Sequence, residues 1–161
     1  MSQAPGQHTE QQRGQHPEQQ PAQRYPEQQP AQRRSGAKQA VHSAHAPRPA
    51  GAYGQGVLAG GFLYTAGFGP QDPATGEVPG TVGPQTAQVL RNVRSVLAER
   101  GLSLDDVVKV TVHLADLHRD FAAFDAAYGE FFTAPYPVRT TVGSELMDIL
   151  VEIDVVAYAG E

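Results

Sequence analysis

Two segments of the chain carry apolar residues at the spacing of an amphipathic α-helix. In residues 82–100, VGPQTAQVLRNVRSVLAER, apolar side chains recur every three or four positions, and Gly101 follows as a helix terminator. In residues 119–132, RDFAAFDAAYGEFF, the aromatic side chains fall on one stripe. These patterns predict two helices, each with one apolar face to bury.

Five shorter segments are predicted to be β-strands, at residues 56–59, 62–66, 107–116, 138–143 and 150–158. The segment 107–116, VVKVTVHLAD, alternates between apolar and polar residues, which places Val108 and Val110 on the same buried face. Gly60 and Gly61 separate the first two strands. They indicate a tight hairpin, because glycine reaches positive φ without steric cost.

The last two predicted strands are separated by a short polar turn, so they are expected to pair with each other. The element order is then β-β-α-β-α-β-β. This order predicts an α+β domain with a mixed sheet and both helices packed on one face of it.

The first 48 residues differ in composition from the rest of the chain. They contain 12 Gln and very few large apolar residues, and PEQQPAQRY at 17–25 is followed by the near-identical PEQQPAQRR at 26–34. So little apolar surface cannot offset the entropy lost on ordering, so residues 1–48 are predicted to be a disordered tail. The folded domain is expected to span residues 49–161.

Charge and residue content narrow the classes of protein. The formal net charge of the chain is −5 and that of the tail is +3, which leaves −8 for the domain, so binding to a nucleic-acid backbone is not expected. The absence of cysteine excludes disulfides and thiolate zinc sites. With neither an apolar run of membrane-spanning length nor a signal-peptide core, a soluble cytoplasmic protein is expected.

Few side chains outside the last two strands suggest chemistry. Four of the six histidines lie in the tail, and His113 and His118 have no further ligand at a recognisable spacing, so no metal site is predicted. Motifs for a nucleophile elbow, a P-loop or a dinucleotide-binding turn do not occur. In the expected folded domain, residues 49–161, no Ser or Thr has a histidine base beside it in the sequence.

Arg139 and Glu152 interrupt the two final strands with charge. The pattern alone leaves two interpretations open. The residues could form a cross-strand ion pair on an exposed sheet face, contributing about 0–1 kcal/mol. Alternatively, Arg139 could clamp an anion through its planar guanidinium, while Glu152 holds or polarises a water molecule.

Several stretches together resemble the RidA (YjgF-type) family over about residues 47–159. They are GAYGQG at 51–56, TAGFGPQDPATGE at 65–77, PVRTTV at 137–142 and LVEID at 150–154. The resemblance implies a chorismate-mutase-like fold and a homotrimer with ligand sites between subunits. It further implies hydrolysis of reactive 2-imino or enamine acids, such as 2-iminopropanoate and 2-iminobutanoate, to 2-keto acids and ammonia without a cofactor.

The resemblance also assigns roles to single residues. Arg139 matches the arginine that binds the substrate carboxylate, and Glu152 matches the glutamate near the attacking water. Gly67 matches a backbone group that lines the pocket, and Tyr53 matches a tyrosine of the loop before the first strand. With the small imino or keto acid as partner, these four residues form the expected core of the site.

The chain departs from the family pattern around that core. Ala66 replaces a common Ser, Thr141 replaces a common Cys, and Asp125 stands where an Asn is typical. Thr141 and Asp125 are expected among the substrate-binding residues, with Asp125 adding a negative charge beside an anionic ligand. Two alternatives therefore stay open: a related enzyme acting on another small carboxylate, and a non-catalytic trimeric binding or chaperone-like module.

Overall fold

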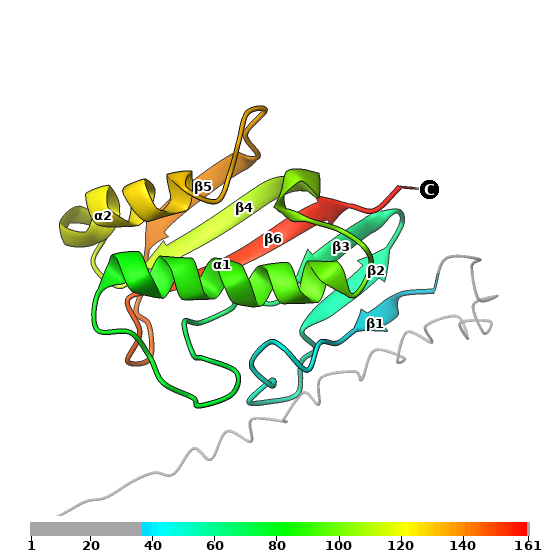
Figure 1. Cartoon of the computed structure of the whole chain (residues 1–161), viewed down its shortest axis with the longest axis horizontal. Coiled ribbons are helices and arrows are strands. Elements are labelled where there is room, and N and C mark those ends of the chain that lie inside the picture. Colours follow the sequence, from blue (N-terminus) through cyan, green and yellow to red (C-terminus); the bar gives the residue numbers. More distant parts are fainter. Residues whose placement is uncertain (1–36, 161) are drawn as a thin grey trace, which may run out of the picture. The chain divides into compact units, whose positions relative to one another are not determined.

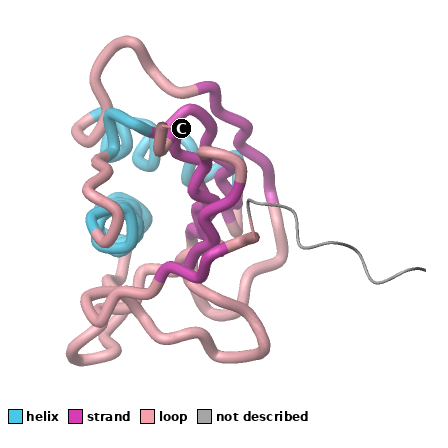
Figure 2. Tube along the Cα trace, turned by 90° about the vertical axis from the view of Figure 1, so that its right-hand side faces the viewer, coloured by secondary structure: helices cyan, strands magenta, loops and turns pink. Residues whose placement is uncertain are grey.

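The computed structural model describes residues 37–160, which form a six-stranded sheet with two helices on one face (Figures 1 and 2). In chain order the elements are β1 (Gln39–Val41), β2 (Gly56–Ala59), β3 (Phe62–Thr65), α1 (Val82–Ala98), a 3₁₀ turn (Leu104–Asp106), β4 (Val107–Leu114), α2 (Leu117–Gly129), β5 (Val138–Gly143) and β6 (Val151–Tyr158). The predicted α+β class is confirmed, with one additional strand at the beginning.

The strand order in the sheet is β1-β2-β3-β6-β4-β5. All neighbouring strands are antiparallel except β4 and β5, which are parallel. The expected pairing of β5 with β6 is wrong, because β4 lies between them. Helix α2 connects β4 to β5 and returns the chain to the end where β4 began, so β5 must run parallel to β4.

The core lies between the helices and the sheet, and its residues include Leu90, Leu97, Val110, Phe124 and Ile153, all fully buried. In β4 the alternation holds only after a register shift between Val107 and Lys109. Val107 is buried and Val108 is 41% exposed, so the expected inward position of Val108 is wrong. This shift is typical of a β-bulge, which inserts one extra residue into a strand, so Val107 instead of Val108 faces the core.

Both helices are displaced from their predicted ends by a few residues. Helix α1 ends at Ala98, and Gly101 lies beyond it with φ of 69°. Helix α2 begins two residues earlier than expected, because the carboxylate of Asp116 accepts a hydrogen bond from the backbone N–H of Arg119 at 3.0 Å. In the described residues neither helix is long and apolar enough to cross a bilayer.

Ordered structure begins before the expected boundary at residue 49. Strand β1 pairs with β2, and Val41 and Ala46 are buried in the core. The side chain of Gln55 fastens this segment: it accepts a hydrogen bond from Ser43 N and donates to carbonyl oxygens of the same segment. A boundary at residue 48 is therefore too late. The tandem repeat and the rest of residues 1–36 lie outside the described residues, so disorder there stays a prediction.

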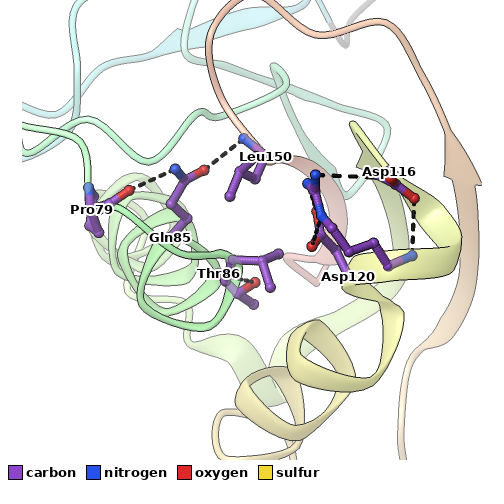
Figure 3. A network of polar contacts seen from close by, with 8 residues as sticks. Pro79, Gln85, Thr86, Asp116, Asp120 and Leu150 are labelled. Atoms are coloured by element: carbon purple, nitrogen blue, oxygen red, sulfur yellow. Dashed lines mark hydrogen bonds and ion pairs between the residues drawn. The ribbon is translucent and has the colours of Figure 1, made fainter.

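Figure 3 shows polar contacts of buried side chains on both helices. One of these side chains, that of Gln85, joins α1 to the segment that leads into β6. The amide of Gln85 donates to Pro79 O and accepts from Leu150 N, both at 2.7 Å. Asp120 of α2 is buried and pairs with Arg119 at 2.6 Å. The bonds of Gln85 fix the residue that immediately precedes β6, and with it the register of the strand that carries Glu152.

Candidate functional site

The residues expected in the site fall into two groups in the single chain. Arg139 and Asp125 line one cavity, between α2 and the start of β5. Tyr53 and Gly67 line another, beside the loop that follows β3. Glu152 belongs to the second group, because its carboxylate lies against Gly67.

The first cavity, which we call the arginine pocket, has a volume of about 370 Å³. Its wall consists of Asp125, Tyr128, Gly129, Tyr136, Pro137 and Arg139. Asp125 and Arg139 are the only charged residues among them. They form an ion pair, with Nη2 of Arg139 2.7 Å from Oδ1 of Asp125. Arg139 is therefore partnered by α2, and the predicted cross-strand pair with Glu152 is absent from the described residues.

Three aromatic rings of α2 hold the guanidinium of Arg139. Its central carbon lies 4.6 Å from the ring centroid of Tyr128, 5.2 Å from that of Phe124 and 6.0 Å from that of Phe121. These residues recur at helical spacing, so one stripe of α2 both packs on the core and seats the cation. The Arg139 side chain is 24% exposed, which leaves its edge open to the pocket.

Two hydroxyl groups near Arg139 are buried without a hydrogen-bond partner in the described part of the chain: Tyr128 OH and Thr141 Oγ1. Burial raises the pKa of Tyr128 to about 12, and the nearby Arg139 opposes that rise. Tyr128 is therefore a neutral donor at ordinary pH. Thr141 lies two residues after Arg139, on the same face of β5, but does not line the arginine pocket.

The second cavity has a volume of about 250 Å³ and is lined by the segments 47–50 and 66–69 together with Tyr53, Gln55 and Gln71. We call it the glycine pocket. Tyr53 is 54% exposed, and its hydroxyl accepts a hydrogen bond from Ala50 N at 3.1 Å. Its phenol therefore stands at the rim of this pocket.

Gly67 allows Glu152 to approach the backbone closely. Phe68 exchanges two hydrogen bonds with Ile153, at 2.9 and 3.1 Å, which brings Gly67 beside Glu152. A Cβ atom at Gly67 would lie 2.5 Å from Oε1 of Glu152. The absence of a side chain is thus what makes room for the carboxylate.

The loop of the glycine pocket is held from α1 by a residue that the sequence analysis missed. Asn92 is 1% exposed, and its amide donates to Gly69 O at 3.0 Å and to Gln71 O at 2.9 Å. The only signal was a polar residue in the helical stretch, which the apolar pattern does not single out.

Arg139 and Glu152 lie on opposite faces of the sheet. Arg139 pairs in register with Val110, whose side chain is buried beneath the helices. Glu152 pairs with His113, three positions further along β4. Because successive residues of a strand face opposite ways and paired residues share a face, the two charged side chains point away from each other. One chain does not present both to one small molecule.

His113 has a partner that its sequence neighbours did not reveal. Its Nδ1 atom lies 2.7 Å from Oγ of Ser144, the residue that follows β5. The two residues are 31 positions apart, so only the parallel pairing of β4 and β5 brings them together. In residues 37–160 no group of three potential metal ligands occurs.

Comparison with known proteins gives consistent matches over this part of the chain. The sequence model of the family described as Endoribonuclease L-PSP matches residues 43–159. RutC family protein PH0854 of Pyrococcus horikoshii is 44% identical over 75% of this chain and 98% of its own length. The 2-iminobutanoate/2-iminopropanoate deaminase of Escherichia coli K12 is 39% identical, over 73% of this chain and 94% of its own.

Solved structures show the same fold. The Escherichia coli YjgF gene product superposes with a TM-score of 0.71 at 38% identity, covering 74% of this chain and 98% of that one. Escherichia coli TdcF with bound serine also superposes with a TM-score of 0.71, at 36% identity and the same coverage.

Proposed function

The chain belongs to the RidA (YjgF-type) family, and from that premise we propose that it hydrolyses reactive 2-imino acids to 2-keto acids and ammonia. The observation that carries the proposal is the seating of Arg139, whose guanidinium is fixed by three aromatic rings at the wall of a cavity of about 370 Å³. Small acids such as 2-iminopropanoate and 2-iminobutanoate fit such a cavity.

The chemistry requires orientation more than a strong nucleophile. The fork of Arg139 would bind the substrate carboxylate and fix the position of C2. Glu152 would accept a proton from water as the water oxygen bonds to C2. The proton on Glu152 then passes to the carbinolamine nitrogen, and ammonia leaves as the C=O bond forms and the hydroxyl proton is released. The relative TdcF binds serine, another small molecule with a carboxylate, which supports this ligand class.

A homotrimer would complete the site. Since Arg139 and Glu152 point away from each other in one chain, we infer that the arginine pocket of one copy meets the glycine pocket of the next. The sheet face opposite the helices supports this assembly because it carries large exposed apolar side chains: Tyr64, Val138, Val142 and Tyr158.

The direct test measures keto-acid formation from an imine generated in solution. An amino-acid oxidase or a threonine dehydratase supplies the imine, and the full chain is added in increasing amounts. We expect formation of the keto acid to accelerate in proportion to the protein added. If the rate equals that of the uncatalysed hydrolysis, the deaminase proposal fails and a binding module becomes the better account.

A further inference from the structure

Asp125 pairs with one nitrogen of Arg139, beside the place where an anionic ligand would bind the guanidinium. Its carboxylate lies 2.7 Å from Nη2 of Arg139, and its side chain is 49% exposed at the pocket wall. Since these two residues are the only charged ones that line the pocket, its net charge is zero. A ligand therefore meets a positive and a negative group side by side, instead of an isolated cation.

The guanidinium that Asp125 contacts is also held by aromatic rings of α2. The rings of Tyr128 and Phe124 lie close to the guanidinium, at 4.6 and 5.2 Å from its central carbon. Asp125 directly follows Phe124 on α2, so the same turn of helix positions the carboxylate and a ring that lies close to the guanidinium. A simple monoanion would bind Arg139 with a second carboxylate beside it, which weakens its binding.

A ligand that carries both charges suits this arrangement. In a protonated 2-imino acid the carboxylate and the C=N–H⁺ group are joined through one carbon–carbon bond. The carboxylate can face the open edge of Arg139 while the N–H⁺ faces Asp125, so each charge meets its opposite.

We propose that Asp125 is a specificity-determining residue that selects the iminium form of the substrate over the keto-acid product. This inference rests on the proposed function, and it explains why the substrate binds in preference to the product. The substrate has a cationic nitrogen for Asp125, whereas the product has a carbonyl oxygen in its place, which Asp125 repels. The step itself is balanced: water bonds to C2 while the C=N electron pair moves onto the protonated nitrogen, and the released proton passes to a base.

The test compares two ligands of one carbon skeleton, the zwitterion L-2-aminobutanoate and the monoanion 2-oxobutanoate. Calorimetric titration of the full chain should show that the wild type prefers the zwitterion. In Asp125→Asn we expect 2-oxobutanoate to bind about 10-fold more tightly and the zwitterion about 10-fold more weakly, because the repelling and attracting charge are removed together. Asp148→Asn, which removes a charge from an exposed turn, should leave both affinities unchanged.

Kinetics give an independent readout. In Asp125→Asn, inhibition by added 2-oxobutanoate should become about 10-fold stronger while kcat/KM for the imine falls, which loss of structure alone would not produce. The inference is overturned if the wild type and Asp125→Asn show the same preference between the two ligands, or if the wild type binds neither ligand. Either result decides against it even if the wild type hydrolyses imines. If the preference inverts but the wild type does not hydrolyse imines, Asp125 still selects zwitterionic over anionic ligands in this pocket, and the proposed function fails.

Discussion

At the scale of single residues, Arg139 is positioned by groups of three kinds. Aromatic rings cover its face, the carboxylate of Asp125 meets one of its nitrogens, and the strand fixes its backbone. Its side chain lines the arginine pocket and is partly exposed there. The side chain is thus held in place before a ligand arrives, which lowers the entropy lost on binding.

Replacing Arg139 with Ala should reduce imine hydrolysis by about two orders of magnitude or more, because charge-assisted hydrogen bonds of about 1.5–3 kcal/mol each are lost. Arg139→Lys should not restore full activity, because an ammonium group lacks the planar fork. The coupled assay described above measures both variants, and circular dichroism checks that the fold is retained. Wild-type activity in Arg139→Ala would remove this residue from the mechanism.

Tyr128 gives a prediction for the pH dependence of stability. Its pKa rises from 10.0 to about 12 in the folded chain, so between these values the folded state holds a proton that the unfolded state has lost. The free energy of unfolding should therefore fall as pH rises through this window, by about 1–3 kcal/mol, and be unaffected by this group below it.

Tyr128→Phe should remove that part of the alkaline fall. At about pH 7 the variant should be at least as stable as the wild type, because it buries no hydroxyl without a partner. Urea unfolding of both proteins at neutral and alkaline pH measures the difference. If the two proteins lose stability in parallel, Tyr128 does not titrate as its burial implies.

The residue scale also shows the limits of reading the sequence. Motif resemblance singled out Arg139, Glu152 and Gly67 as candidates, because local patterns carry them. It could not show that Asp125 is the partner of Arg139, because that contact depends on how α2 crosses β5. The pair of His113 and Ser144 was invisible for the same reason: only the sheet brings them together.

At the scale of elements, periodicity predicted both helices and five strands close to their observed ranges. It failed for the pairing of β5 with β6, because a short polar segment between two strands suggests a hairpin but does not require one. It also failed for β1, whose three residues are too few to show a period. The low apolar content of its surroundings concealed a strand that is stabilised by pairing with β2, by Gln55 and by the burial of Val41 in the core.

Gln55→Leu should lower the free energy of unfolding by about 1–3 kcal/mol, because Ser43 N and the carbonyl groups that Gln55 binds lose a buried partner. Gln39→Ala, which removes an exposed contact with Arg100, is the matched control and should change stability by less than about 0.5 kcal/mol. Chemical denaturation distinguishes the two. An unaltered midpoint in Gln55→Leu would show that β1 does not depend on this side chain.

At the scale of the whole molecule, the proposed site requires several copies of the chain. Light scattering should give about three times the 17.2 kDa chain mass. A monomer in solution would contradict a site built between copies. The exposed apolar residues of the sheet face opposite the helices would then need another explanation.

A mixture of two inactive variants tests the shared site directly. Arg139→Ala retains Glu152, and Glu152→Gln retains Arg139, so an interface between the two variants can contain both native side chains. Refolding or co-expressing them in equal amounts should restore roughly a quarter of wild-type activity, the random share of such interfaces. Each variant refolded alone is the control. No recovery in verified mixed trimers would place both residues of a site within one chain.

The opposite facing of Arg139 and Glu152 has a consequence for how activity depends on the amount of protein. If the site is shared between copies as proposed, a newly synthesised chain that has met no other copy does not hydrolyse imines, however completely it has folded. Specific activity then declines on dilution, in step with dissociation, while the secondary structure of each chain persists. Activity would then begin only after folded chains have assembled, and the time needed for assembly would depend on the local concentration of the chain.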